Sequence, residues 1–179
     1  MNNLNLWTLG HGYLYDVYTI ITVGGVATDV VKTKTGFRKL VQGNGNIVIN
    51  DRIMHLKGFA WRAQNPWPAI GDAFPAWMAD FQHNLMLDIK GNFVRPMHVV
   101  ALASGIESAD RRGIGYDMPA GDAEAAVTGV QWDERKEVMR TSIIYSRNNP
   151  SVFMWEAGNA DMAATEVRQP RRSFICRRE

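Results

Sequence analysis

The sequence predicts an α/β fold in which a set of β-strands precedes strands that alternate with helices. Two patterns carry this prediction. Up to about residue 46, apolar and polar residues alternate between turn signals, as in strands that are joined by hairpins. From Ile53 onward, short apolar runs alternate with stretches of helical periodicity, which is typical of parallel βαβ units. About four such units fit into the sequence, half of the number in a (β/α)₈ barrel.

Residues 1–46 are expected to form part of a β-sandwich. Leu6–Tyr18 alternates apolar and polar side chains with a period of two, which predicts a half-buried strand. Gly24 and Gly25 then favour a hairpin, because glycine adopts positive φ angles at little cost. A second strand is expected at Val26–Thr35. After it, an alternating stretch leads to Asn44-Gly45, the strongest hairpin signal in the sequence.

Residues 47–164 are expected to hold the strands that alternate with helices. After Pro75, a suitable first residue for a helix, apolar side chains recur with i, i+4 spacing and form one stripe. The stripe consists of Trp77, Phe81, Leu85 and Ile89, with Met78 beside it. Two more helices are expected at Ser104–Arg112 and Trp132–Ser146. The expected strands are Met54–Ala60, Asn92–Val94, Gly113–Met118 and the apolar run that follows Pro150.

Residues 165–179 differ in composition from the rest of the chain and are expected to be a disordered basic tail. This segment holds five Arg and two Glu, so it contributes +3 to the net charge of +2 and leaves about −1 for the remainder. A charge run at one end of a chain is usually solvated. We therefore expect no nucleic-acid partner.

Several other classes of protein are excluded by simple patterns. No apolar run approaches the roughly 18 residues that span a membrane, so no membrane partner is expected. The first residues lack the basic region and apolar block of a signal peptide, so none is expected in this chain, and the cellular location stays open. The single cysteine, Cys176, excludes an internal disulfide. The four histidines lack the spacing of metal ligands, so neither a metal nor a cofactor is expected.

Residues 146–162 read SRNNPSVFMWEAGNADM. The apolar run predicts a buried strand, and polar residues follow at its C-terminal end, where parallel α/β barrels do their chemistry. This segment resembles the fourth barrel strand of family 2 glycoside hydrolases, the group of β-galactosidases, β-glucuronidases and β-mannosidases. The family pattern is roughly R-N-x-P-S-[VI]-x-x-W-x-x-G-N-E, and its final Glu is the catalytic acid/base. The matching residues are Arg147, Asn148, Pro150, Ser151, Val152, Trp155, Gly158 and Asn159, whereas Ala160 replaces the Glu.

Two further segments are similar to the same family. Gly36-Phe37-Arg38 matches its G-F-R pattern, and Asn92, Val94, Arg95 and His98 match its N-x-V-R-x-S-H pattern. The resemblance implies the C-terminal part of an immunoglobulin-like β-sandwich over residues 1–46, followed by the N-terminal half of a TIM barrel over residues 47–164. It also implies a fragment of a longer enzyme, because the family's nucleophile ends a seventh strand that should lie outside this chain.

The implied activity is the hydrolysis of O-glycosyl bonds with retention, as in β-galactosidases, on a β-glycoside substrate. Retaining glycosidases use two carboxylates about 5 to 5.5 Å apart, and Ala160 removes one of them. Asp161 is a candidate surrogate acid, although adjacent side chains of a strand point to opposite faces. We therefore do not expect this segment alone to hydrolyse glycosides by the usual route.

Five residues are candidates for substrate binding. By resemblance, Arg95 and His98 support the nucleophile and the substrate, and Asn159 hydrogen-bonds the sugar 2-hydroxyl. Trp61 and Trp155 offer aromatic faces on which a sugar ring can stack. The alternatives are an ion pair between Arg95 and a carboxylate, a surface histidine, a turn asparagine and, for Trp155, packing in the core.

Glu156 lies four residues before Ala160, on the same face of the strand and deeper in the expected barrel. A lone buried carboxylate costs several kcal/mol, so we expect Glu156 to pair with Arg95 on the neighbouring strand. Ala160 leaves two other functions open. One is a non-catalytic carbohydrate-binding or interaction protein of the same fold, and the other is an enzyme that uses a different acid. The sugar and the oligomeric state are not predicted.

Overall fold

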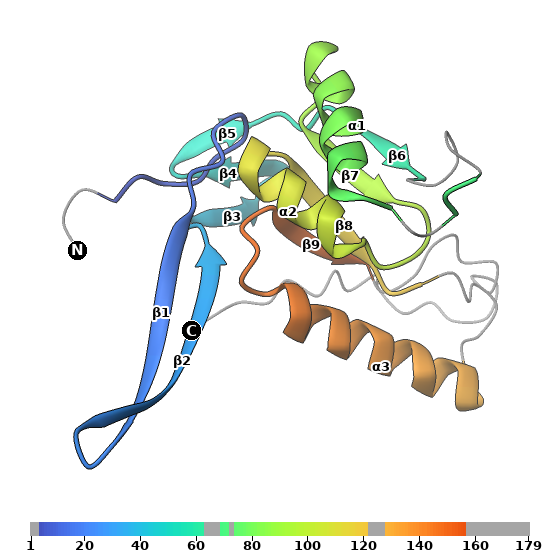
Figure 1. Cartoon of the computed structure of the whole chain (residues 1–179). Coiled ribbons are helices and arrows are strands. Elements are labelled where there is room, and N and C mark those ends of the chain that lie inside the picture. Colours follow the sequence, from blue (N-terminus) through green and yellow to red (C-terminus); the bar gives the residue numbers. More distant parts are fainter. Residues whose placement is uncertain (1–3, 63–68, 72–73, 122–127, 157–179) are drawn as a thin grey trace.

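The computed structural model describes residues 4–62, 69–71, 74–121 and 128–156. Two antiparallel sheets are followed by one parallel sheet and its helices (Figure 1). The antiparallel strands are β1 (Tyr15–Val23), β2 (Val26–Thr35), β3 (Leu40–Gly43), β4 (Asn46–Ile49) and β5 (Arg52–Met54). The parallel strands are β6 (Gly58–Trp61), β7 (Phe93–Pro96), β8 (Gly115–Pro119) and β9 (Val152–Glu156). The helices are α1 (Ala76–Asp88), α2 (Ala103–Arg112) and α3 (Gly129–Ser146).

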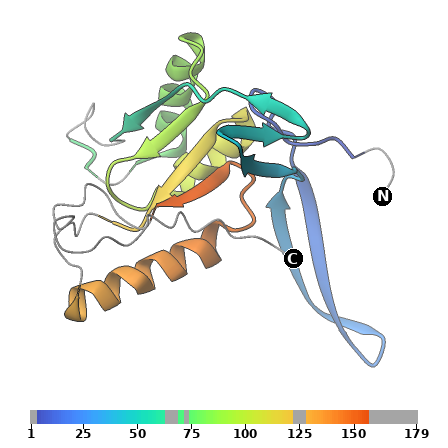
Figure 2. The same ribbon diagram turned by 180° about the vertical axis from the view of Figure 1, so that it is seen from behind.

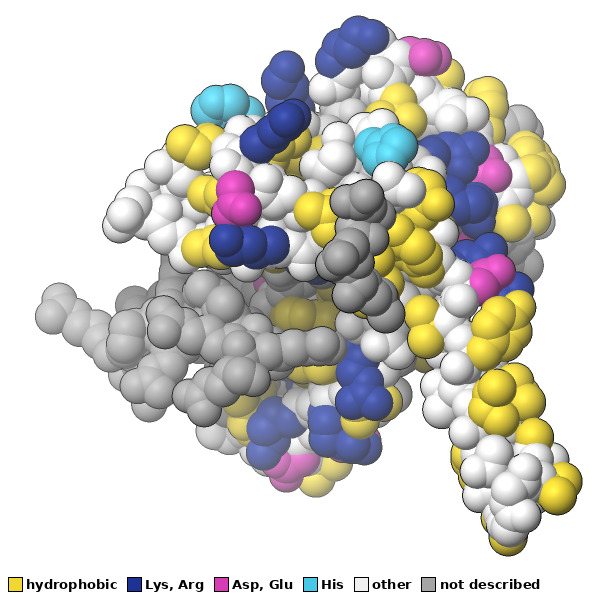
Figure 3. Space-filling model, turned by 90° about the vertical axis from the view of Figure 1, so that its left-hand side faces the viewer, with side chains coloured by type: hydrophobic (Ala, Val, Ile, Leu, Met, Phe, Trp, Pro, Cys, Tyr) yellow, Lys and Arg dark blue, Asp and Glu magenta, His cyan; other side chains and the backbone are white. Residues whose placement is uncertain are grey.

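Strands β1 and β2 form a long ribbon that projects from the body of the molecule (Figures 1 and 3). The predicted hairpin is confirmed: Gly24 and Gly25 have φ angles of 59° and 82°, and β2 has the predicted bounds. The first strand was predicted to begin at Leu6, which is wrong, because residues 8–11 close a tight turn through a bridge between Thr8 and His11. The predicted half-burial is also wrong, since the side chains of the ribbon are exposed along most of its length.

The second hairpin is confirmed at Asn44 and Gly45, whose φ angles are 52° and 75°. It joins β3 to β4, and β4 then pairs with β5 so that Ile47 lies opposite Met54. Met54 therefore belongs to an antiparallel sheet, and the first parallel strand begins at Gly58 rather than at Met54. The antiparallel sheet continues past residue 46, the predicted domain boundary, because the hairpin turn lies inside it.

The four parallel strands pair in the order of the sequence, β6-β7-β8-β9. Helices α1 and α2 cover one face of this sheet, and α3 runs along the β9 side (Figures 1 and 2). The prediction of strands that alternate with helices is confirmed. The main core fills the space between the sheet and the helices and includes Met78, Met86, Val94, Ile106, Ile114, Tyr116, Met118 and Val152.

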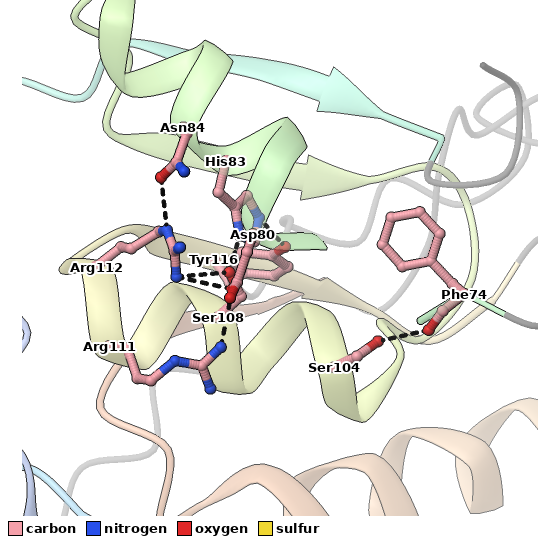
Figure 4. A network of polar contacts seen from close by, with 9 residues as sticks. All are labelled: Phe74, Asp80, His83, Asn84, Ser104, Ser108, Arg111, Arg112 and Tyr116. Atoms are coloured by element: carbon pink, nitrogen blue, oxygen red, sulfur yellow. Dashed lines mark hydrogen bonds and ion pairs between the residues drawn. The ribbon is translucent and has the colours of Figure 1, made fainter. Parts of the chain in front are cut away.

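Helix α1 is confirmed, but the predicted apolar stripe does not face the core. Trp77, Phe81, Leu85 and Ile89 are exposed, whereas Met78, Ala79, His83 and Met86 are buried. The buried face holds a polar network with α2 and β8 (Figure 4). His83 Nδ1 lies 2.9 Å from Ser108 Oγ, and its Nε2 lies 2.8 Å from the Tyr116 hydroxyl. Asp80 forms ion pairs with Arg111 and Arg112 at the rim of this network.

The antiparallel part packs against the N-terminal ends of the parallel strands β7 and β9. Trp7 is fully buried, and its indole N–H donates to the Asp110 carbonyl at 2.8 Å. The Asp110 carboxylate in turn accepts from Asn149 Nδ2 at 2.6 Å and from the Ser151 amide at 3.0 Å. Burial raises the pKa of Asp110. These bonds tie the loop before β9 to the end of α2 and to the N-terminal part of the chain.

Three sequence predictions fall on residues that the structure does not describe: Asn159 to Asp161, the basic tail from residue 165, and Cys176. Among the described residues, no helix combines the length and the apolarity that a membrane crossing requires.

Candidate functional site

Arg95, Asp117 and Glu156 lie on one face of the parallel sheet, toward the C-terminal ends of β7, β8 and β9. Their sequence neighbours identify this face, because side chains alternate across a strand. The neighbours Val94, Tyr116 and Met118 belong to the core under the helices, and Trp155 packs against that core. The three charged residues therefore point to the opposite face, which none of the described helices covers (Figure 2).

An irregularity in β9 is required for this arrangement. Tyr116 pairs with Val152, but the next residue, Asp117, pairs with Met154, so β9 contains one extra residue, Phe153. Val152 belongs to the helix-side core, and uninterrupted alternation would point Glu156 to that side as well. The extra residue shifts the alternation by one and places Glu156 beside Arg95.

Arg95 and Glu156 form an ion pair with two contacts. Arg95 Nε donates to Glu156 Oε2 at 2.6 Å, and Nη2 contacts Oε1. The two side chains are 27% and 18% exposed, so water screens the pair only partly. The predicted pairing is confirmed, but the two strands are not neighbours, because β8 lies between β7 and β9.

His98, two residues after the end of β7, contacts Arg95 within that strand. Arg95 Nη1 lies 3.2 Å from His98 Nδ1. Because a guanidinium has no acceptor, this nitrogen of the imidazole accepts the bond. Arg95 therefore holds a carboxylate with one edge of its guanidinium and contacts an imidazole with Nη1.

Asp117 sits on the intervening strand, next to the ion pair. Its Oδ1 is buried and has no hydrogen-bond partner among the described residues. Burial and the charge of Glu156 together raise the pKa of Asp117 to about 6, while the charge of Arg95 opposes both effects. The cluster thus holds one guanidinium, one imidazole and two carboxyl groups, one of which exchanges its proton near neutral pH.

Sequence reasoning missed Asp117, although a signal was present. Asp117 is the only charged residue in the predicted strand Gly113–Met118. A charged side chain within a buried strand is seldom left unpaired, because the desolvation of an isolated charge is costly. This argument singles out the residue without any family pattern.

The structure places Trp61 in the core. Its side chain is only 8% exposed, and its ring packs against Phe74, His83 and Tyr116 on the helix side of the sheet. Its indole N–H donates to Gln82 on α1. Trp155 is partly buried against the same core, in line with the packing alternative. Neither ring faces the side on which the charged cluster lies.

The predicted residues Asn159, Ala160 and Asp161 lie outside the described residues, so their placement relative to the cluster stays a prediction. Within the described part of the chain, no group of three or more His, Cys, Asp or Glu residues could hold a metal ion. The cluster offers hydrogen-bond donors and acceptors at the edge of a parallel sheet where α/β proteins bind ligands.

Comparison with known proteins relates this chain to one family. The sequence model of glycosyl hydrolases family 2 matches residues 1–38. A β-glucuronidase of Formosa agariphila is 31% identical over 160 residues, which cover 89% of this chain and 16% of the relative. The chain is homologous to the family 2 glycosyl hydrolases.

Other family 2 proteins agree with this assignment. A β-galactosidase of Thermoanaerobacter pseudethanolicus is 25% identical over 160 residues, covering 87% of this chain and 21% of the relative. The solved structure of a Ruminococcus gnavus β-glucuronidase in complex with D-glucuronic acid is 25% identical, with a TM-score of 0.74 over 88% of this chain and 27% of its own. This chain therefore spans between 16% and 27% of the length of these family 2 proteins.

Proposed function

We propose that this chain is a segment of a retaining β-glycoside hydrolase of family 2. The observation that carries the proposal is the cluster of Arg95, His98, Asp117 and Glu156 at the C-terminal edge of a parallel sheet, in a chain homologous to that family. The names of two relatives make a β-glucuronide and a β-galactoside the first substrates to test.

We infer that the parallel sheet is the N-terminal half of a (β/α)₈ barrel and that β1 to β5 belong to an immunoglobulin-like sandwich. In a closed barrel every strand has two neighbours, whereas β6 and β9 each have one among the described strands. The exposed apolar stripe of α1 is the face that an adjacent barrel helix would cover. The apolar side chains of the β1–β2 ribbon would likewise be buried by further strands of the sandwich.

Within this proposal, Arg95 and His98 orient the sugar and the nucleophile, and Asn159 hydrogen-bonds the sugar 2-hydroxyl. Asp161 is the candidate surrogate for the acid that Ala160 lacks, and the nucleophile is supplied by a strand beyond this chain. Trp61 supports the site from the core rather than by stacking, because its ring is buried.

The test is an assay of the longer protein with paired substrates, an aryl β-glycoside and a natural β-glycoside of the same sugar. An aryl leaving group departs with little help from an acid, whereas an alkoxide needs a proton. We expect turnover of the aryl substrate and little turnover of the natural one. The variant Ala160→Glu should raise the natural reaction by roughly 10²- to 10⁴-fold, the usual contribution of a general acid. No turnover of either substrate by the parent or the variant would reject the proposal.

A second function is favoured by the residue at position 160 itself. Ala160 cannot transfer a proton, as would be expected of a protein that binds a carbohydrate and does not cleave it. Sugar binding by calorimetry without turnover of the aryl substrate would support this alternative. Turnover of both aryl and natural substrates by the unchanged protein would instead point to a different acid, with Asp161→Asn as the first variant to test.

A further inference from the structure

Arg38 lies in the antiparallel part of the chain, yet its side chain reaches the start of β9. Arg38 Nε donates to the Pro150 carbonyl at 2.6 Å, and Nη2 donates to the Val152 carbonyl at 2.7 Å. The guanidinium carbon also lies 5.1 Å from the centre of the Phe153 ring. Arg38 therefore contacts Phe153, the extra residue of β9, and binds the carbonyls of Pro150 and Val152, which precede it.

The two carbonyls that Arg38 binds lie on either side of Ser151, where a turn leads into β9. Pro150 belongs to the turn before β9 and Val152 is the first residue of the strand, and the planar guanidinium binds the carbonyls of both. The Ser151 carbonyl, which lies between them, accepts instead from the Tyr116 amide of β8 at 2.7 Å. The start of β9 is thus held on one side by β8 and on the other by Arg38.

The residues just before Arg38 also pack tightly against the turn that precedes β9. A Cβ atom on Gly36 would lie 2.9 Å from both the Pro150 and the Trp7 side chains, so position 36 has no room for a larger residue. Thr35 Oγ1 donates to the Asn148 carbonyl at 2.6 Å. Burial lowers the pKa of Arg38 to about 10, which leaves the side chain charged at neutral pH.

We propose that Arg38 is a positioning residue that sets the register of β9, so that Phe153 is the extra residue and Glu156 faces Arg95 and Asp117. The G-F-R segment thereby links the antiparallel part of the chain to the charged cluster. Any effect of Arg38 on substrate binding or turnover rests on the proposed hydrolase function. The effect of Arg38 on the register of β9 does not.

The test measures amide hydrogen exchange by NMR in the 179-residue chain and in its variants. The Ala120 amide donates to the Glu156 carbonyl at 2.9 Å, beyond the extra residue, and reports the register there. The Met97 amide donates to the Trp61 carbonyl at 2.9 Å, between β6 and β7, and serves as the internal reference. In Arg38→Ala we expect the exchange of Ala120 to rise at least about tenfold more than that of Met97, because two bonds from a charged donor are lost.

Asn50→Ala is the matched control. The side-chain hydrogen bonds of Asn50 join it to Trp7 and Lys39, in the antiparallel part of the chain. This variant should change the exchange of Ala120 and Met97 by the same factor. An equal change of both amides in Arg38→Ala would overturn the proposal, since Arg38 would then contribute only to general stability.

Arg38→Lys covers the case in which Arg38→Ala does not fold. A lysine keeps the charge but cannot form two parallel bonds or stack with its planar group on Phe153. It should show the same selective rise at Ala120, and exchange at the rate of the unchanged chain would reject the proposal. A pH titration followed by ¹³C NMR should also show a lower pKa of Asp117 in Arg38→Lys than in the unchanged chain. The reason is that the negative charge of Glu156 would no longer lie beside Asp117. No substrate is used, so these results are independent of whether the longer protein is a hydrolase.

Discussion

Arg95 and Glu156 form an ion pair across the full width of strand β8, with Arg95 Nε 2.6 Å from Glu156 Oε2. Glu156→Gln keeps the shape of the side chain but removes the charge that is ion-paired with the partly buried guanidinium, so that Asp117 is the remaining acidic group beside it. We expect the free energy of unfolding to fall by about 1–3 kcal/mol, measured by urea denaturation at pH 7. Glu137→Gln is the control, because its pair with Arg140 is exposed on α3 and should have no measurable effect. Equal effects of the two variants would contradict this prediction.

Asp117→Asn should stabilise the chain at neutral pH. The pKa of Asp117 is about 6 in the folded chain against an ordinary value of 3.8, so the folded state holds the proton more tightly. Stability is therefore lost as the pH rises from about 4 to 6, and the uncharged Asn avoids this loss. At pH 7 the variant should gain up to about 3 kcal/mol, with no gain below pH 4. Urea denaturation at both pH values tests this, and a variant that is destabilised equally at both would refute it.

His83 should make the chain sensitive to acid. Burial and the charge of Arg112 lower the pKa of His83 to about 4, against an ordinary value of 6.5. The stability that the neutral imidazole provides is complete above pH 6.5 and is lost as the pH falls toward 4, by up to about 3 kcal/mol. His83→Asn should lack this pH dependence, as judged from thermal unfolding between pH 4 and 7. His55→Gln, at an exposed position, should retain it.

Gly12→Ala should weaken the contact between the two parts of the chain. A Cβ atom on Gly12 would lie 2.3 Å from the Asp110 carbonyl oxygen and 2.4 Å from that of Arg111. Both are backbone atoms at the end of α2 and cannot turn away. We expect a loss of at least about 2 kcal/mol in denaturation. In the control Gly43→Ala, no atom lies within 4 Å of the new Cβ, so stability should be unchanged or slightly higher. A loss in the control of similar size would show that the crowding is not the cause.

Local patterns predicted the hairpins, the α/β alternation and the pairing of Glu156 with Arg95, because each depends on few residues. It was harder to predict which face of each helix or strand is buried and which is exposed. Helix α1 has two usable faces, and the sequence favoured the stripe from Trp77 to Ile89 over the face that contains His83. The buried face was selected by the polar contacts of His83 with α2 and β8, which no periodicity within α1 reveals.

The sequence by itself determined the family and the order of the elements, since turn residues, strand lengths and helix periodicity act over short distances. Only the tertiary structure decided that Asp117 lies beside the pair of Arg95 and Glu156 and that Trp61 belongs to the core. The direction of Glu156 depends on one extra residue in β9, held by Arg38 from more than a hundred positions earlier in the chain. A shift of one residue turns every following side chain to the other face of a strand, and no local pattern fixes that shift.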